Sequence, residues 1–349
     1  MRRRTPPHPD RCSYNPATMA ERRSLWMGCL CVAALILAGC GPQTPGRGAG
    51  SVTFTVVALN ACWLFDGVGE DDFSTAPQSP EAAEEHLRDV AAYLAAVEPD
   101  IVSIAEIEDH RMLDRLNERL GGEYHPIFVQ GSDDYTGQDV AALSRFPVMG
   151  SGRSDARARY PIPESQLRGP QGTEGVSKHY WATTEIGGWT ITWIGLHLLA
   201  YPDDLQRVTR REAQASIIRD LARRFLDAGH EVVVLGDVND FDSDVCDAAA
   251  NEPRSCVDRL LKDVDPDREG DELVNICRDV EPSERYTYWY DRNRNGIDDG
   301  DTEHSQIDHV YVSQGLAARL VDVRIDRAYE AGTVSDHWPI VATFELPTE

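Results

Sequence analysis

Several apolar, strand-like runs in this chain meet acidic, amide or histidine side chains at one end, and this pattern constrains the fold more than any other feature. One such run, Ile340–Phe344, follows directly after the sequence Ser335–Pro339. The neighbouring side chains of Asp336 and His337 can ligate a metal ion and move a proton at a single place. A lone Asp-His dipeptide is weak evidence, because many such pairs lie in surface turns. Its meaning therefore depends on the other clusters along the chain.

Length and composition allow one large domain with a substantial core. The chain has 349 residues, of which 41% are hydrophobic, and its formal net charge is -25 with a pI of about 4.7. This length is long for one average domain and short for three. Such an acidic balance is not the basic footprint of a high-affinity nucleic-acid binder. It does not exclude a nuclease, because bound divalent cations offset phosphate repulsion locally.

The N-terminus has the organisation of an export signal. Arg22 and Arg23 precede the apolar run Leu25–Ala38, which is too short to span a bilayer as a stable helix. This run leads into Leu37-Ala38-Gly39-Cys40, which resembles a bacterial lipobox. We therefore expect residues 1–39 to be a signal peptide and Cys40 to carry a lipid. An ordinary signal peptide or a short membrane anchor is the alternative interpretation.

Residues 40–50 are rich in glycine and proline, which is typical of a flexible tether. With the lipidated cysteine, they predict export and anchoring of the protein to the bacterial cell envelope, at the outer membrane or the cell surface. An exported domain permits disulfide bonds. Cys246 and Cys256 are close in sequence and are the first candidates, although Cys277 can pair with either. Cys62 follows an apolar strand and can simply be buried.

After residue 50 the elements alternate as in a mixed α and β domain. Apolar residues at helical spacing predict helices over residues 81–97, 112–120 and 205–226. On the last of these, Arg210, Arg211 and Glu212 are expected to form a solvated face. Strands are predicted over residues 52–59, 101–104, 124–129, 140–143, 180–186, 190–196, 231–235, 307–312, 320–325 and 340–344. Residues 151–176 are expected to form a long surface loop. One α/β or α+β domain with mixed sheets over residues 51–349 fits best.

A carboxylate and an amide follow one of the most apolar strands. Asp237 and Asn239 follow the run Val232–Leu235, after Gly236. In an extended chain, side chains two residues apart point to the same side. The two groups can therefore hold a water molecule and a phosphoryl oxygen together. The alternative interpretation is an Asx turn at the end of the strand, which is a common use of both residues.

Other polar residues also mark the ends of apolar runs. Glu106 follows a buried strand and is a natural ligand for a hard cation. Asn60 ends another run and by itself is as well explained as a turn residue. His197 ends a third run, where a histidine is usually a core or edge residue, and Asp308 can orient an imidazole or pair with an arginine. Because all of them lie where strands meet loops, we expect them to converge on one functional site.

These motifs, in this order, resemble those of the endonuclease/exonuclease/phosphatase superfamily, which includes DNase I-like nucleases, neutral sphingomyelinases and inositol polyphosphate 5-phosphatases. The resemblance covers almost all of residues 52–345, and it is carried by Asn60, Ala105-Glu106-Ile107, Asp139–Arg145, Leu196-His197-Leu198, Gly236–Asn239, Ile307-Asp308-His309 and Ser335–Ile340. One departure is Ala105, where the family usually has glutamine. The resemblance implies an α/β (α+β) fold of DNase I type. This is a four-layer sandwich of two packed mixed, mostly antiparallel sheets flanked by helices.

The resemblance implies a metal-dependent reaction. Glu106 and Asn60 would hold Mg²⁺ or Mn²⁺ at the scissile phosphate, with Asp336 as a contributor. Such a cation neutralises developing charge and templates in-line attack. Asp139 is a candidate to orient His197.

The resemblance also implies catalytic roles for the remaining residues. His337 would be the general base, oriented by Asp308, since an imidazole titrates near neutral pH. Asp237 and Asn239 would position the attacking water and a phosphate oxygen. His197 would donate a hydrogen bond to the phosphoryl group.

A second metal site is predicted in the sequence Asp291–Asp299, which resembles a calcium loop of the EF-hand type. Such a loop has oxygen ligands at positions 1, 3, 5 and 9 and glycine at position 6. The candidate ligands for Ca²⁺ are Asp291, Asn293, Asn295 and Asp299. The loop departs from the pattern at Asp298, which replaces an apolar residue, and at Thr302, which occupies the bidentate position. A solvated acidic turn is the alternative interpretation.

Together these observations predict an exported, monomeric, divalent-metal-dependent phosphoester hydrolase, in the first place a phosphodiesterase or nuclease. Its substrate would be a nucleic acid, a phospholipid or an inositol phosphate. A sphingomyelinase-like enzyme or an inositol-phosphate-type phosphatase is the alternative, because the acidic charge argues mildly against tight nonspecific DNA binding. A lipid-active enzyme should expose an apolar hairpin near the site, and none is obvious. A non-catalytic binding module would have lost residues from the clusters, and nearly all are present.

Overall fold

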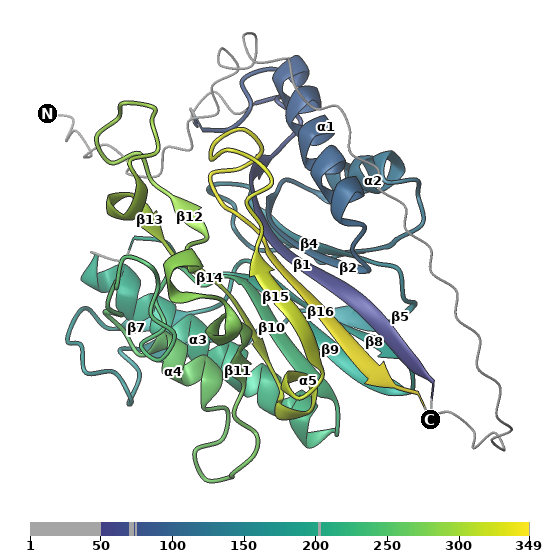
Figure 1. The fold of residues 1–349 in the computed structure, drawn as a ribbon. Coiled ribbons are helices and arrows are strands. Elements are labelled where there is room, and N and C mark those ends of the chain that lie inside the picture. Colours follow the sequence, from purple (N-terminus) through teal and green to yellow (C-terminus); the bar gives the residue numbers. More distant parts are fainter. Residues whose placement is uncertain (1–49, 70–72, 74, 202–203, 349) are drawn as a thin grey trace, which may run out of the picture.

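Two six-stranded sheets pack face to face at the centre of the molecule (Figure 1). The structure is a computed structural model, and it describes residues 50–69, 73, 75–201 and 204–348. The predicted signal peptide, the predicted lipidation site Cys40 and residues 40–49 of the predicted tether lie outside these described residues. Helices cover the outer face of each sheet, so the predicted four-layer sandwich is confirmed.

The first sheet combines the beginning of the domain with its last two strands. Its order from edge to edge is β15 (Leu320–Ile325), β16 (Ile340–Pro347), β1 (Ser51–Leu64), β2 (Ile101–Ile107), β4 (Asp139–Ser144) and β3 (His125–Phe128). β1 and β2 run parallel and are connected through α1 (Pro80–Val97), whereas the other neighbours are antiparallel.

The second sheet is built from the middle of the chain. Its order is β11 (Val274–Asn275), β14 (Asp308–Val312), β10 (Glu231–Asp237), β9 (Trp189–His197), β8 (His179–Ile186) and β5 (Val148–Gly152). β9 and β10 run parallel and are connected through α3 (Leu205–Asp227), and the other neighbours are antiparallel. Both sheets are therefore mixed and mostly antiparallel, as predicted.

The remaining elements are short and lie in the connections. They are the hairpin β6 (Ala158–Tyr160) and β7 (Gly172–Glu174), the hairpin β12 (Tyr288–Trp289) and β13 (His304–Ser305), the helices α2 (His110–Arg119), α4 (Val257–Lys262) and α5 (Gln314–Ala317), and the 3-10 turns Ile276–Asp279, Pro282–Glu284 and Gly300–Thr302. The first hairpin corrects the prediction of a plain surface loop over residues 151–176, because it packs on α3. Within the described residues, no helix combines the length and apolar character that crossing a membrane requires.

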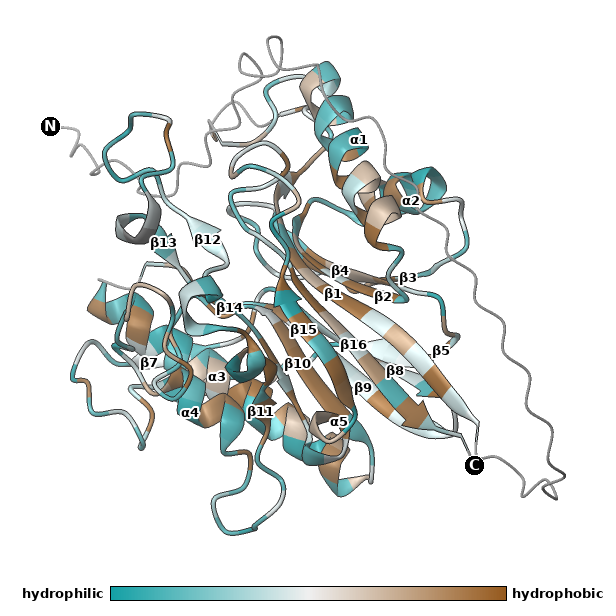
Figure 2. Cartoon of the chain, viewed as in Figure 1, coloured by the Kyte–Doolittle hydropathy of each residue, from teal (hydrophilic) through white to brown (hydrophobic). Residues whose placement is uncertain are grey.

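Burial on both faces explains why the strands are so apolar. Along β1, Phe54 and Val56 point into the core between the sheets, while Val57 and Leu59 pack with α1 and α2 on the other side. Because side chains alternate along a strand, a strand covered on both faces becomes a continuous apolar run. Figure 2 shows this pattern, with hydrophobic colour along the central strands and hydrophilic colour on the outer surfaces of the helices.

One aromatic residue links the two sheets directly. The Phe54 ring stacks on Phe344 of β16, with centroids 5.4 Å apart, and meets Trp193 of β9 edge to face at 6.2 Å. Such pairs contribute about 0.5–1.5 kcal/mol each beyond the burial of their surface. The Trp193 indole nitrogen donates a hydrogen bond to Thr184, so this buried polar group is also satisfied.

The long helix α3 has a different exposed face from the one predicted. Its N-terminus is capped by Asp204, whose side chain accepts hydrogen bonds from the amides of Gln206 and Arg207. The prediction that Arg211 and Glu212 are solvated is wrong, since they are only 0% and 1% exposed. Arg211 is buried as a charge pair with a distant aspartate, and Glu212 accepts a hydrogen bond from a backbone amide.

The predicted disulfide between Cys246 and Cys256 is also wrong. Both residues are free thiols, as is Cys277. The Cys256 thiol donates to a Glu212 carboxylate oxygen, whereas the exposed Cys246 thiol donates to the carbonyl oxygen of Ser243. The two sulfur atoms therefore have separate partners.

Candidate active site

The predicted catalytic and metal-binding residues converge at one end of the two sheets. Parallel strands end at the same edge of a sheet, so β1 and β2 bring Asn60 and Glu106 together, and β9 and β10 bring His197 and Asp237 together. β14 runs antiparallel to β10 and begins at that edge, where Asp308 pairs with Asp237. Strand direction alone therefore places these side chains in one site.

The segment before β16 completes the site from the first sheet. β16 is antiparallel to β1 and begins beside its polar end, so Asp336 and His337 arrive next to Asn60. The Ser335 hydroxyl donates to the Asn60 carbonyl oxygen at 2.8 Å and accepts a hydrogen bond from the His337 amide at 3.0 Å. The two sheets thus contribute opposite walls of one site.

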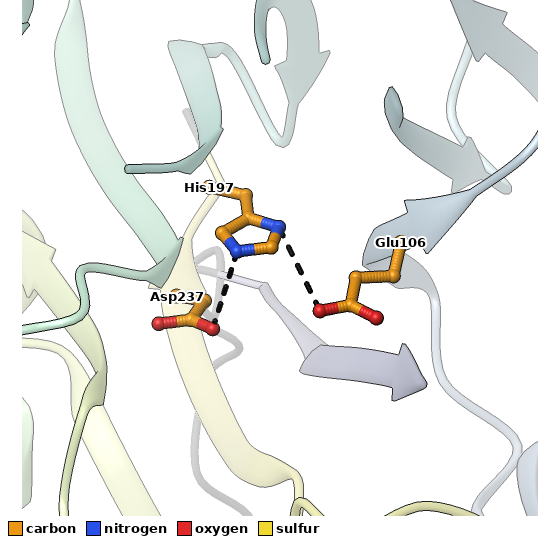
Figure 3. A group of neighbouring side chains, drawn as sticks. All are labelled: Glu106, His197 and Asp237. Atoms are coloured by element: carbon orange, nitrogen blue, oxygen red, sulfur yellow. Dashed lines mark ion pairs between the residues drawn. The ribbon is translucent and has the colours of Figure 1, made fainter. Parts of the chain in front are cut away.

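Asp237 lies at the centre of the side-chain arrangement. The His337 Nδ1 atom is 2.6 Å from an Asp308 carboxylate oxygen, while its Nε2 atom is 4.0 Å from Asp237. On the other side of Asp237, His197 Nε2 lies 3.6 Å away, and His197 Nδ1 lies 4.0 Å from Glu106. Figure 3 shows the His197 ring between the two carboxylates of Glu106 and Asp237.

Asn60, a residue of β1, hydrogen-bonds to two of the carboxylates. Its amide nitrogen donates to Glu106 and to Asp237, at 3.1 Å in each case. Its amide oxygen accepts a hydrogen bond from the Cys62 amide at 3.0 Å, and such an oxygen has a second lone pair. Asn60 is therefore placed to orient both carboxylates and keeps one acceptor position for a further partner.

Two predicted residues of this site have unusual backbone conformations. Glu106 and Asn239 have positive φ angles of 62° and 54°. Residues other than glycine hold this left-handed conformation only where the surroundings impose it, often at functional sites. Gly236 precedes Asp237 with φ of 130°, and a Cβ atom there would lie 2.1 Å from the Leu196 carbonyl oxygen. Only glycine allows β10 to approach β9 this closely.

Burial and crowding of charges shift the titration of the site. Burial, with the neighbouring Asp308 and Glu106 charges, raises the pKa of Asp237 to about 8. Burial likewise raises the pKa of Asp336 to about 7, and the Glu106 charge adds to it. Burial alone would lower the pKa of His337, but the charge and hydrogen bond of Asp308, together with the Asp336 and Asp237 charges, raise that pKa to about 10. Without a cation, Asp237 and Asp336 therefore keep their protons to a higher pH than ordinary carboxyl groups, because ionising all of these buried acids would crowd negative charge.

His197 titrates in the opposite direction. Burial holds the pKa of His197 well below its ordinary value, and the positive charge of Lys178 lowers it further. The ring is therefore neutral near pH 7, so one of its nitrogens is a potential donor and the other a potential acceptor.

This geometry matches a known family. The model of the Endonuclease/Exonuclease/phosphatase family matches residues 60–337, which includes both walls of the site. The chain belongs to this family. Nucleases and phosphatases share the hydrolysis of a phosphoester bond, so the chain is placed among the phosphoester hydrolases. No curated protein matches the chain.

Solved structures share the fold of this family member over most of its length. The 3'-5' exonuclease NExo from Neisseria meningitidis is 21% identical with a TM-score of 0.56, over 83% of this chain and 99% of its own. Truncated Caenorhabditis elegans TDP2 is 18% identical with a TM-score of 0.52, over 84% of this chain and 97% of its own. An endonuclease/exonuclease/phosphatase protein from Beutenbergia cavernae is 18% identical with a TM-score of 0.53, over 84% of this chain and 72% of its own. These likenesses confirm the four-layer fold.

The endonuclease/exonuclease/phosphatase site has the donor set of a divalent cation. Ligand atoms lie within 4.8 Å of one another in two groups, which are Glu106, His197 and Asp237, and Asp237, Asp308 and His337. The buried Nδ1 atom of His197 has no hydrogen-bond partner. Hard carboxylate oxygens suit Mg²⁺ and Mn²⁺, and a cation would offset the crowded charge that raises the carboxyl pKa values. The residues therefore fit the predicted metal.

Two of the predicted residues have partners other than those expected. The Asn239 side-chain amide donates to the Leu198 carbonyl oxygen at 3.1 Å, and its backbone amide donates to Asp237 at 2.9 Å. The expectation that Asp139 orients His197 is wrong. Asp139 instead accepts hydrogen bonds from Gln130 and from the Gly131 amide.

Some residues that build the site were not assigned a role from the sequence. Ser335 was recognisable, since a serine two residues before His337 is a common local hydrogen-bonding arrangement. Thr287 had no such signal, yet its hydroxyl accepts hydrogen bonds from the amides of Ile307 and Asp308. It thereby fixes the start of β14 from a segment that is distant in the sequence.

The predicted calcium loop lies in the connection between β12 and β13. The Asp291 carboxylate accepts hydrogen bonds from the amides of Asn295 and Gly296, and Asp299 accepts from the side chains of Asn293 and Asn295. These contacts suit both a calcium loop and an acidic turn, so Ca²⁺ binding stays a prediction. The hairpin reaches the site through the Trp289 amide, which donates to the Asp336 carbonyl oxygen at 2.9 Å.

Proposed function

We propose that this protein is a divalent-metal-dependent phosphodiesterase, in the first place a nuclease, with His337 as its general base. The observation that carries the proposal is the chain of contacts from Asp308 through His337 to Asp237, with Glu106 opposite. A buried imidazole that one carboxylate orients, beside further carboxylates, can accept a proton from water next to a bound phosphate.

The tautomer of His337 follows from its partner. In the neutral form of His337, Asp308 accepts the Nδ1 proton and Nε2 is the ring atom left to take a proton. A bound divalent cation would favour this neutral form by opposing the raised pKa of the metal-free chain. Nε2 faces Asp237, whose carboxylate can hold the attacking water against it. His197, being neutral and buried on the other side of Asp237, can donate a hydrogen bond to a phosphoryl oxygen.

Glu106 and Asp336, with the amide oxygen of Asn60, are the residues that would hold the metal. Mg²⁺ or Mn²⁺ bound there would withdraw charge from the phosphoryl group as a Lewis acid. Glu106 is already oriented for this role, since its carboxylate oxygens accept hydrogen bonds from Asn60 and from the Trp63 amide.

Nucleic acid is the substrate class with the most support. Two structures with this fold are described with DNA, namely Danio rerio TDP2 complexed with a single-strand DNA product, and the NExo 3' phosphatase bound to a product DNA hairpin. Among the described residues, the large exposed apolar side chains lie on separate segments: Val68, Tyr135, Met149, Leu205, Ile297 and Val321. A membrane-inserting hairpin therefore has no support here.

We further propose that the protein is exported and lipid-anchored. The support is the sequence Leu37–Cys40, which follows a charged and then an apolar segment. Residues 40–50 would then tether a single catalytic domain, residues 51–349, to the cell envelope, where it would act as a monomer.

One assay tests the enzymatic proposal and its alternatives together. The purified protein is incubated with DNA, RNA, sphingomyelin and inositol phosphates, each with Mg²⁺, Mn²⁺, Ca²⁺ or EDTA. We expect cleavage of DNA or RNA with Mg²⁺ or Mn²⁺ and none with EDTA. Cleavage of sphingomyelin or inositol phosphates alone would replace the nuclease proposal, and activity that EDTA does not diminish would overturn the metal mechanism.

A further inference from the structure

A fully buried arginine lies behind the candidate active site. Arg211 of α3 is 0% exposed, and its partner Asp240 is 1% exposed. The guanidinium donates one hydrogen bond to Asp240 at 3.2 Å and another to the Leu199 carbonyl oxygen at 2.8 Å. Burying a charge pair is costly unless its geometry is well satisfied, so such a pair is weak evidence for added stability and can instead fix a particular arrangement.

Helix α3 makes hydrogen bonds to both the amide and the carbonyl oxygen of Leu199. Gln214, one turn beyond Arg211, accepts a hydrogen bond from the Leu199 amide at 2.9 Å, while Arg211 donates to the Leu199 carbonyl oxygen. Gln214 also donates to the Gly175 carbonyl oxygen, beside β7. The backbone just beyond β9 is therefore fixed to a rigid helix.

Leu199 and Asp240, the two partners of Arg211, directly follow the segments that carry the active-site residues of β9 and β10. Leu199 follows Leu198, whose amide donates to the Asp237 carbonyl oxygen and whose carbonyl oxygen accepts from the Asn239 side chain. Asp240 directly follows Asn239. Arg211 thus spans the two chain segments that leave β9 and β10, immediately behind His197 and Asp237.

The left-handed backbone of Asn239 is one feature that these contacts hold in place. Its φ of 54° is uncommon for residues other than glycine, although asparagine adopts it more readily than most. The Leu198 carbonyl oxygen accepts a hydrogen bond from the Asn239 side chain, and Arg211 donates to Asp240, the residue that follows Asn239. Without Arg211, the Asp240 carboxylate would be buried with its charge unpaired.

We propose that Arg211 is a positioning residue for the active site, which rests on the proposed hydrolase function. By joining Leu199 to Asp240, it sets the separation between the segment that carries His197 and the segment that carries Asp237 and Asn239. It touches neither substrate nor reacting atoms. Arg211 therefore acts on turnover through the geometry of these residues.

Steady-state kinetics of Arg211→Met and Arg211→Lys test this role on the substrate that the wild-type protein cleaves. We expect Arg211→Met to lower kcat by about 100-fold with KM little changed, because displacement of a catalytic group by about 1 Å has effects of this size. Arg211→Lys keeps the charge but not the planar fork that reaches both partners, so an intermediate loss is expected.

The matched control is Arg223→Met. Arg223 lies on the same helix and also donates to a backbone carbonyl oxygen, that of Val264, but it lies away from the site. We expect its kcat to equal that of the wild type. A folded Arg211→Met variant with unchanged kcat would overturn the proposal. If Arg211→Met does not fold, Asp240→Asn takes its place, with the same loss of kcat expected and unchanged kcat again overturning the proposal.

Hydrogen exchange tests the positioning role of Arg211 independently of the proposed activity. In the wild-type protein, the amides of Leu198 and Asn239 are hydrogen-bonded and should exchange slowly. Arg211→Met should accelerate their exchange selectively relative to the core amides of β10, whatever substrate the protein cleaves. Unchanged protection of both amides would contradict the positioning role even if the protein hydrolysed no phosphoester.

Discussion

His337 and Asp308 are joined by a 2.6 Å hydrogen bond between Nδ1 and a carboxylate oxygen, although 29 residues separate them in the sequence. The bond fixes the imidazole ring so that Nε2 faces Asp237, 4.0 Å away. Burial would lower the pKa of His337, but this bond and the Asp308 charge, with the Asp336 and Asp237 charges, raise it above its ordinary range. The pair therefore decides which ring atom accepts a proton and at which pH.

Replacement of Asp308 should change the pH dependence of the reaction. A general base acts in its neutral form, so activity rises with pH through the pKa of His337. Asp308→Asn removes the charge that raises this pKa, so the acidic limb of the pH–kcat profile should move to lower pH. Because the ring also loses its orienting partner, kcat should fall by roughly 10²–10⁴-fold. Asp322→Asn, an exposed acid on β15, should change neither property. An acidic limb that does not move would contradict the assignment.

The metal-free protein should lose stability as the pH rises. Asp237, Asp336 and His337 all have a pKa in the folded chain that is raised above the ordinary values of 3.8, 3.8 and 6.5. The folded state therefore binds more protons than the unfolded state, so unfolding becomes easier as pH rises toward the raised values of about 8, 7 and 10. Each group contributes up to about 1.4 kcal/mol per pH unit. Thermal unfolding in EDTA from pH 6 to pH 9 measures this loss.

Asp237→Asn provides the control for this effect. The amide cannot ionise, so in EDTA the Tm of Asp237→Asn should fall less between pH 6 and pH 8 than the Tm of the wild type. Added Mg²⁺ should raise the wild-type Tm more at pH 8 than at pH 6, since the ionised carboxylates bind a cation better. A wild-type Tm that rises over this interval in EDTA would show that the pKa directions are wrong.

The position of most site residues was predictable because it follows from strand direction. Asn60, Glu106, His197 and Asp237 each end an apolar run, and parallel neighbours bring such ends together. The apolar runs were themselves visible because helices cover both sheets. The chemistry of the site could thus be inferred from residues that are adjacent to recognisable strands.

Other contacts depend on tertiary distances that have no local signal. Arg211 has the same sequence context as a solvated helix residue, and its burial is explained by its contacts with Asp240 and the Leu199 carbonyl oxygen, which the sequence does not reveal. Cys246 and Cys256 are near in sequence, yet their thiols have different partners in the fold. Spacing along the chain is therefore a weaker guide than the end of a strand.

The loop between β12 and β13 should bind calcium if its acidic residues form a cation site. Ca²⁺ should raise the Tm of the wild-type protein, and Asp291→Ala should remove this shift, because Asp291 is the first residue of the loop pattern. Asp155→Ala removes a fully exposed acid elsewhere and should keep the shift. If Ca²⁺ did not shift the Tm of the wild-type protein, the calcium prediction would be wrong and the acidic-turn interpretation would hold.

Export and lipidation can be tested on the full-length chain in a bacterial host. The wild-type protein should fractionate with membranes and incorporate labelled palmitate, because a lipid anchor provides the hydrophobic attachment. Cys40→Ala should abolish the label and release the protein from the membrane fraction. Cys277→Ala, which removes a buried free cysteine within the domain, should keep the label. Equal labelling of wild type and Cys40→Ala would contradict the lipidation proposal.

The most direct test of the central claim compares wild type, His337→Ala and His125→Ala in DNA hydrolysis with Mg²⁺. His125 is an exposed histidine at the start of β3, so its replacement should leave kcat unchanged. Loss of the general base at His337 should lower kcat by roughly 10²–10⁴-fold, with circular dichroism showing that the variant is folded. Near-normal hydrolysis by folded His337→Ala would contradict the account of this site.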